Sequence, residues 1–82
     1  MDSWEEIDGA LDRVFEFDSF PAAIAFVDRL AEAAEAANHH PDIDIRYNRV
    51  TLALVTHDSG GITRLDLELA GAIDRIGTVP TV

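Results

Sequence analysis

The periodicity of the hydrophobic residues changes several times along this chain, and the order of these changes limits the fold. After the turn signal Asp8-Gly9, one set of alternate residues from Leu11 to Phe17 is mostly apolar, which indicates a hairpin with a half-buried strand. A second alternating run covers residues 42–47, with Asn48 at the position of a tight turn. The β-rich run Val50–Val55 is apolar on both faces, so we expect a central strand there.

A helix is predicted between the two hairpins. Ser19 or Asp18 can cap its amino end, Pro21 is tolerated in its first turn, and Asn38 followed by Pro41 closes it. Apolar residues at helical spacing should face a core: Phe20, Ile24, Val27 and Leu30.

A second helix is predicted after the loop of residues 58–61. It opens at Thr63, and Asp66 three residues later gives an acidic variant of the capping box. Gly77 and Pro80 end the helix. Its expected apolar stripe is Leu65, Leu69, Ala72, Ile73 and Ile76.

The resulting order is ββαββα, and the predicted class is α+β. We expect a single domain over residues 1–82, with a four-stranded antiparallel sheet and two helices on one face. The other face of the sheet, or its edge, is left for a partner. A chain this short gains stability from oligomerisation, so a homodimer or homotetramer is expected.

Composition excludes several classes of function. The formal net charge is −10, with six arginines and no lysine, which argues against nucleic acid as a partner. No apolar segment approaches the length needed to span a bilayer, and no amino-terminal segment resembles a signal peptide. We therefore expect a cytoplasmic protein without a membrane partner. The absence of cysteine excludes disulfides and thiolate metal sites.

Three histidines lie beside predicted element boundaries. His39 and His40 follow the first helix, and His57 ends the central strand. Imidazole donates and accepts protons near neutral pH, so these residues are candidates for acid/base catalysis. They could equally be surface or capping residues. A metal site that also includes Asp58 is a further alternative, but the usual spacing of ligand pairs is absent.

A longer pattern resembles the signature of the pterin-4a-carbinolamine dehydratases. It comprises Glu35-Ala-Ala-Asn-His39-His40-Pro41, then Tyr47, Thr56-His57-Asp58 and Asp66, all at the spacings of that signature. The flanks agree as well, with Leu-x-Arg-x-Phe-x-Phe over residues 11–17 and Gly-Gly-Ile-Thr before Asp66. The resemblance covers the chain from about Trp4 to Ile76.

The resemblance implies a reaction. Members of this family remove water from a 4a-hydroxytetrahydropterin, giving a quinonoid dihydropterin, and so recycle the cofactor of aromatic amino acid hydroxylases. The reaction needs no metal, no other cofactor and no covalent intermediate. By resemblance, His39 and His57 are the leading acid/base pair, and His40 binds and orients the ring.

The resemblance also implies a set of residues that bind the pterin. Pro41, Thr56, Asp58 and Ser59 match positions that line the pocket. Glu35 lies four residues before His39 and could hydrogen-bond that histidine or the pterin, or could be an exposed helix acid.

Other features of the resemblance concern structure rather than chemistry. Tyr47 and Asp66 are interpreted as a packed ring and a helix cap. The family's usual N-terminal helix is expected to be missing, because only three residues precede Trp4. Some proteins that resemble this family are non-catalytic dimerisation or assembly modules, which is the alternative function.

Overall fold

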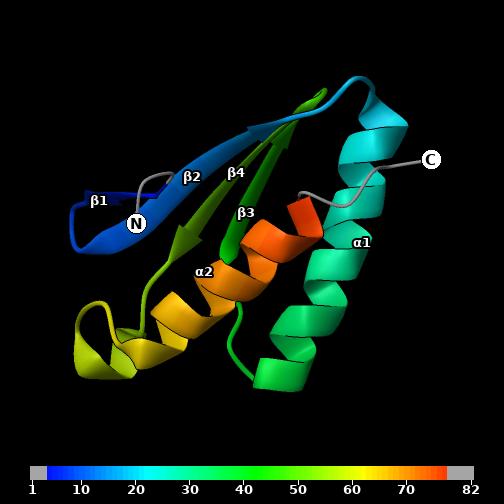
Figure 1. Ribbon diagram of the computed structural model, residues 1–82. Coiled ribbons are helices and arrows are strands. Elements are labelled where there is room, and N and C mark those ends of the chain that lie inside the picture. Colours follow the sequence, from blue (N-terminus) through cyan, green and yellow to red (C-terminus); the bar gives the residue numbers. More distant parts are fainter. Residues whose placement is uncertain (1–3, 78–82) are drawn as a thin grey trace.

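The structure, a computed structural model, describes residues 4–77 and contains the predicted ββαββα order within them (Figure 1). A single-turn 3₁₀ helix lies in the predicted loop before the last helix. The elements are β1 (Glu5–Ile7), β2 (Ala10–Glu16), α1 (Phe20–Ala37), β3 (Asp42–Arg46), β4 (Arg49–Leu54), η1 (His57–Ser59) and α2 (Arg64–Gly77).

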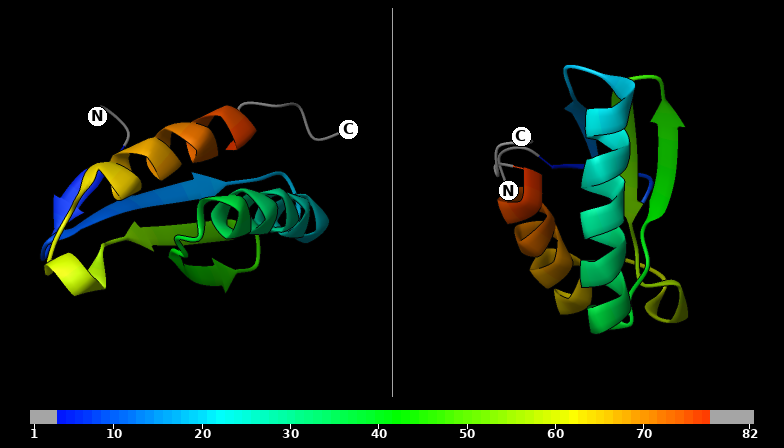
Figure 2. Two further views of the ribbon diagram at one scale, coloured as in Figure 1. Left: turned by 90° about the horizontal axis from the view of Figure 1, so that it is seen from below. Right: turned by 90° about the vertical axis from the view of Figure 1, so that its right-hand side faces the viewer.

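The four strands form one antiparallel sheet in the order β1-β2-β4-β3. The predicted central strand is confirmed, because β4 pairs with β2 on one side and with β3 on the other. Val50, Leu52 and Leu54 of β4 are fully buried and point to the face that carries the helices. Both helices lie on this face, as predicted (Figure 2, right).

The core stripe of α1 follows the predicted one only in part. Leu30 is fully buried and Val27 packs against the core, as predicted, whereas Phe20 is 47% exposed and Phe26 is fully buried instead. The helix is rotated so that the Phe26 ring packs against Phe15 and Phe17, with centroids 4.8 and 5.0 Å apart. Two stripes of apolar residues in α1 have helical spacing, one with Phe20 and one with Phe26. The stripe that is buried is the one whose phenylalanine, Phe26, packs against the aromatic rings of β2 and the residue after it. The buried positions of α1 are Ala23, Phe26, Leu30 and Ala34.

The ends of α1 follow the predicted signals. The Ser19 hydroxyl accepts a hydrogen bond from the backbone N–H of Ala22 at 3.2 Å, which is the usual N-cap contact. Asn38 adopts the left-handed conformation with φ 51°, and its N–H reaches the carbonyls of Ala34 and Glu35. The chain therefore leaves the helix sharply after Ala37.

A polar contact ties α2 to the amino-terminal part of the chain. The Trp4 indole N–H donates to the Asp74 carboxylate at 2.9 Å, and the Arg13 guanidinium binds the same oxygen. Trp4 is buried, and Arg13 also lies over the face of the Phe15 ring. These contacts fix the carboxyl-terminal half of α2 over β2, at the end of the helix far from the histidines.

The two hairpin turns both contain a residue with positive φ. Asp8 and Gly9 have φ values of 52° and 82°, as the Asp-Gly signal predicted. The other turn is formed by Tyr47 and Asn48, and Tyr47 has φ 54°. The prediction of a packed ring at this position is wrong, because Tyr47 is 70% exposed. Within residues 4–77, neither helix is long and apolar enough to cross a membrane.

Candidate active site

Three segments meet at one end of the sheet, where the predicted site residues gather. They are the residues that follow α1, the residues that follow β4, and the first turn of α2 (Figure 1). Between them lies an open hollow of about 400 Å³. All three histidines, which lie beside element boundaries, border it. The lining residues are Asn38, His39, His40, Val55, Thr56, His57, Asp58 and Leu65.

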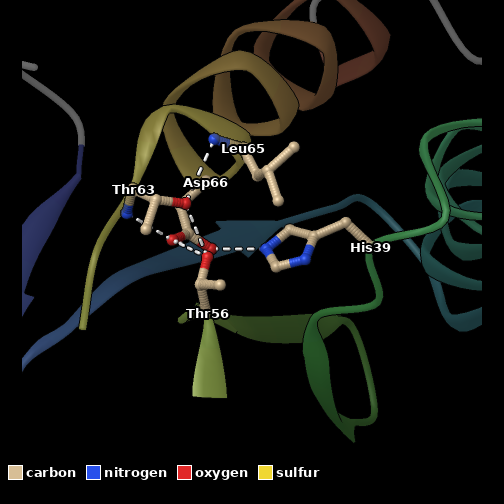
Figure 3. A network of polar contacts seen from close by, with 5 residues as sticks. All are labelled: His39, Thr56, Thr63, Leu65 and Asp66. Carbon is tan, nitrogen blue, oxygen red and sulfur yellow. Dashed lines mark hydrogen bonds and ion pairs between the residues drawn. The ribbon is translucent and has the colours of Figure 1, made fainter. Parts of the chain in front are cut away.

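His39 is held in place by contacts on both sides. Its backbone N–H donates to the carbonyl of Ala34 at 3.1 Å, which continues the closing turn of α1. Its side chain is 12% exposed, and Nε2 lies 2.6 Å from Oδ1 of Asp66 (Figure 3). Because a carboxylate only accepts, Nε2 carries the proton and Nδ1 is left to exchange protons with a ligand.

Asp66 is the fully buried acid that receives this contact. Its Oδ2 accepts from the Thr56 hydroxyl and from the backbone N–H of Thr63, both at 2.8 Å. The two threonine hydroxyls also contact each other at 2.7 Å (Figure 3). Burial by itself raises the pKa of Asp66, but the hydrogen bonds from His39, Thr63 and Thr56 outweigh it and hold the pKa below its ordinary value.

The predicted cap at the start of α2 is therefore present, and Asp66 also has a second role, which is to bind His39. One carboxylate oxygen caps the helix at Thr63, and the other binds the imidazole of His39. In the sequence, the capping signal already accounts for an acid at position 66, so nothing there indicates a second role for Asp66. Only the fold brings a residue 27 positions away into contact with it.

His40 and Glu35 form a second, exposed pair. Nε2 of His40 lies 2.8 Å from Oε1 of Glu35, and their side chains are 58% and 81% exposed. Spacing allows Glu35 either to reach His39 or to be an exposed helix acid, and it is exposed and does not contact His39. The left-handed turn at Asn38 instead directs His39 inward toward Asp66 and leaves His40 beside the glutamate. Glu35 thus contacts the site through His40 and does not line the hollow.

His57 and Asp58 stand on a short loop that is closed at its base. The backbones of Thr56 and Gly61 exchange two hydrogen bonds, at 3.0 and 3.4 Å. Gly60 takes the left-handed conformation with φ 72°, which lets the loop return in so few residues. Both His57 and Asp58 are exposed at the hollow. In the described part of the chain, the His57 imidazole makes no hydrogen bond, so it is available to a ligand.

Two predicted binding residues lie outside this hollow. Ser59 borders a neighbouring hollow of about 350 Å³, which Thr63, Arg64 and Glu68 also line. The two hollows share Thr56 and Leu65. Pro41 lines neither of them and is half-buried.

Sequence reasoning missed several residues at the site. Leu65 was placed in the core stripe of α2, but it is 48% exposed and borders both hollows, because the first turn of α2 projects past the sheet. Asn38 and Val55 also line the hollow, although the sequence indicates only a helix end and a strand end at these positions. Within residues 4–77, no group of three or more potential ligand side chains is arranged to hold a metal ion.

Comparison with known proteins places this chain in a family. Residues 1–76 match the family model described as "Pterin 4 alpha carbinolamine dehydratase". A protein from Acidobacterium capsulatum, named "Putative pterin-4-alpha-carbinolamine dehydratase", is 55% identical over 76 residues, covering 93% of this chain and 83% of its own. A protein of the same name from Chloroflexus aurantiacus is 60% identical over 73 residues, covering 89% and 78%. The chain belongs to the pterin-4a-carbinolamine dehydratase family.

Two solved structures share the fold. The crystal structure of a transcriptional coactivator/pterin dehydratase from Brucella melitensis superposes with a TM-score of 0.89 at 37% identity, covering 94% of this chain and 84% of that one. A pterin dehydratase-like protein, identified as a RuBisCO assembly factor in the alpha-carboxysome, superposes with a TM-score of 0.75 at 23% identity, covering 94% and 89%. The second likeness concerns the fold alone.

Proposed function

We propose that this protein dehydrates a 4a-hydroxytetrahydropterin to a quinonoid dihydropterin and water, by histidine acid/base catalysis. The observation that carries the proposal is the His39–Asp66 pair, which borders the same hollow as His40 and His57. A buried carboxylate that orients an imidazole at the wall of a hollow is an arrangement suited to proton transfer. Membership of the family supports the same reaction.

The chemistry needs two proton transfers. The bond from carbon 4a to its hydroxyl oxygen breaks, and hydroxide is a poor leaving group, so an acid must protonate that oxygen as it departs. The adjacent ring nitrogen loses its proton to a base, and a carbon–nitrogen double bond forms. One proton is delivered and one is collected, so the enzyme returns to its starting state. Positioned imidazoles contribute about 10²- to 10⁴-fold in such steps.

We assign these transfers to His39 and His57. His39 is the oriented member, since Asp66 fixes its protonated nitrogen and its ring. His57 is the free member on the facing loop, exposed to the hollow. His40 lies at the rim, bound to Glu35, and serves to bind and orient the pterin.

Asp66 acts in this proposal as a positioning residue. It is fully buried and touches His39 rather than the hollow. Its negative charge favours the imidazolium that forms when His39 accepts a proton. The surrounding threonine contacts keep the carboxylate ionised and fixed in orientation.

Polar groups around the hollow supply the binding contacts. Thr56 and Asp58 line it directly, and we propose that they bind the pterin. Ser59 lies in the adjoining hollow, where it can reach only the periphery of a bound ring. Glu35 acts through His40, which it contacts, and Pro41 acts through its place next to His40 in the chain. We further propose that the protein works as a homodimer or homotetramer in the recycling of tetrahydropterin.

The test is stopped-flow ultraviolet absorbance of 4a-hydroxytetrahydropterin decay. Wild type should accelerate the decay, and His39→Ala and His57→Ala should each lower that acceleration at least about tenfold. Asp18→Asn, on the exposed loop before α1, is the control and should leave it unchanged. If folded wild type leaves the spontaneous rate unchanged, the enzymatic proposal fails, and a non-catalytic assembly module of the same fold becomes the better account.

A further inference from the structure

A second hollow adjoins the histidine hollow, and most of its residues have no part in the proposed chemistry. Its volume is about 350 Å³, and it meets the first hollow along Thr56 and Leu65, which line both. The rest of its wall comes from the loop after β4 and from the start of α2: Ser59, Thr63, Arg64 and Glu68. A ligand in the histidine hollow can therefore extend past Thr56 and Leu65 into a second, polar space.

Two polar side chains of the second hollow are already used within the protein (Figure 3). The Thr56 hydroxyl donates to Asp66 at 2.8 Å, so the 2.7 Å contact between the two threonine hydroxyls has Thr63 as its donor. Thr63 Oγ1 in turn accepts from the backbone N–H of Leu65 at 3.3 Å. Each hydroxyl has a single hydrogen, so neither threonine has a donor left for a ligand.

Three other polar side chains of this hollow remain free to bind a ligand. In the part of the chain that the structure describes, the side chains of Ser59, Arg64 and Glu68 form no hydrogen bond or ion pair, and all three are exposed. Arg64 and Glu68 lie one helical turn apart on the same face of α2, with about 5–6 Å between their Cβ atoms. The hollow thus offers a cationic donor, an anionic acceptor and a hydroxyl around one short space.

The position of Arg64 is not explained by the stability of its own helix. Arg64 is the first residue of α2, where the positive end of the helix dipole disfavours a cation. A base four residues before an acid is also the weaker order for a helical ion pair, and the pair with Glu68 is not formed. The chain has only six arginines and no lysine. An unpaired guanidinium at the edge of a hollow is therefore better explained by a ligand.

The chemistry of the proposed substrate directs its substituent toward this space. The reaction breaks the bond from carbon 4a to oxygen and removes the proton of the adjacent ring nitrogen. Carbon 6, which carries the substituent of a tetrahydropterin, is bonded to that same nitrogen. Thr56 precedes His57 in the chain, and its hydroxyl binds the carboxylate that holds His39. The boundary between the two hollows thus lies beside both proposed acid/base residues, and the substituent begins one bond from the nitrogen that is deprotonated.

The charges around the second hollow favour a neutral substituent with hydroxyl groups. A phosphate group would face one cation, Arg64, but two carboxylates, Glu68 in the same hollow and Asp58 in the adjoining one. A hydroxyl group can accept a hydrogen bond from the guanidinium and donate one to the carboxylate, and the charges strengthen both contacts. A methyl substituent would use neither of them.

We propose that the second hollow binds the carbon 6 substituent of the pterin, and that Arg64 and Glu68 bind its hydroxyl groups and so determine a preference for a hydroxylated substrate. Ser59 adds a further polar contact from the loop. Because the ring must occupy the histidine hollow, this assignment rests on the proposed dehydratase function.

Two substrates that differ only at carbon 6 test the assignment. One 4a-hydroxytetrahydropterin carries a methyl group there, and the other carries a dihydroxypropyl group, for which wild type should have the lower KM. Arg64→Ala and Glu68→Ala should each raise the KM of the hydroxylated substrate about five- to tenfold, as expected for the loss of one charge-assisted hydrogen bond. kcat should not change, because the reacting atoms are not touched, and both constants should stay as in wild type for the methyl substrate.

The matched control is Arg49→Ala, which removes the same charge at the opposite end of β4 and should leave both substrates unaffected. Arg64→Ala should not lower Tm, since the removed cation lies at the unfavourable end of the helix dipole. Calorimetric titration with the two corresponding tetrahydropterins, which lack the 4a hydroxyl, measures the same preference as a Kd without turnover. There, each variant should weaken only the binding of the hydroxylated compound.

The assignment is overturned by an equal KM for the two substrates in wild type, or by variants that leave KM unchanged or raise it equally for both substrates. A lower KM for a substrate phosphorylated on the substituent than for the hydroxylated one would also overturn it, and would indicate a site for an anion. In each of these cases an active wild type leaves the dehydratase function standing. A wild type inactive toward both substrates would instead overturn that function.

Discussion

The Nε2 atom of His39 lies 2.6 Å from Oδ1 of Asp66, and the carboxylate is completely buried. This contact joins the end of α1 to the first turn of α2. It also joins a side chain that borders the hollow to one that does not. The proposed acid/base role of His39 depends on it.

Asp66→Asn should lower kcat at least about tenfold while changing KM little. An amide in place of the carboxylate loses the charge that favours the imidazolium and can stabilise the wrong tautomer of His39. Asp74→Asn is the matched control, since Asp74 also binds two side chains but at the other end of α2. An unaltered kcat in Asp66→Asn would leave Asp66 as a helix cap only.

The lowered pKa of Asp66 makes a prediction about stability and pH. A carboxyl group with a lowered pKa in the folded state contributes stability above its unfolded pKa of about 3.9, and this contribution is lost as pH falls through the folded pKa. The loss of unfolding free energy caused by Asp66→Asn should therefore be largest near neutral pH and should shrink below about pH 4. Urea unfolding of both proteins between pH 2.5 and pH 7 measures this. A difference that grows on acidification would contradict it.

Asp12→Asn should stabilise the protein at neutral pH. Burial, together with the carboxylates of Asp8, Glu5 and Asp42, raises the pKa of Asp12. A raised pKa means that the ionised form is disfavoured in the folded state, so stability is lost as pH rises through that region. The substitution should raise Tm by about 1–3 °C at pH 7, and the gain should vanish near pH 3. Calorimetry at the two pH values is the check; an equal gain at both would argue for a cause other than charge.

The orientation of α1, which buries Phe26 and exposes Phe20, can be tested with two matched substitutions. Phe26→Ala should destabilise the fold by about 3–5 kcal/mol, because it removes a fully buried ring from the aromatic cluster. Phe20→Ala should cost less than about 1 kcal/mol, since that side chain is 47% exposed. Chemical denaturation compares the two directly. A larger loss for Phe20→Ala than for Phe26→Ala would mean that the stripe predicted from spacing alone describes the core better.

Most of the fold follows from patterns that act over a few residues. Asp8-Gly9 sets the first turn, Ser19 begins α1, and Asn38 ends it, each through the conformation or hydrogen bonds of its own neighbourhood. The position of β4 in the middle of the sheet follows from its apolar character on both faces. These features are local or compositional, so the sequence contains them directly.

The site was only partly predictable, because some of its contacts join residues that are far apart in the sequence. Their places beside element boundaries made His39, His40 and His57 candidates for one site, and all three border one hollow. Spacing could not show which histidine each acid binds. The left-handed residue at Asn38 decides that Glu35 binds His40 and that Asp66 binds His39.

The sequence by itself determined the order of elements, the turns and caps, and the set of residues able to carry out acid/base chemistry. The tertiary structure alone decided which face of α1 enters the core, why Leu65 and Tyr47 are exposed, and why a capping carboxylate also orients a histidine. The physical reason is that periodicity and capping depend on neighbours along the chain. Burial and pairing depend instead on segments that only folding brings together, such as the end of α1 and the start of α2.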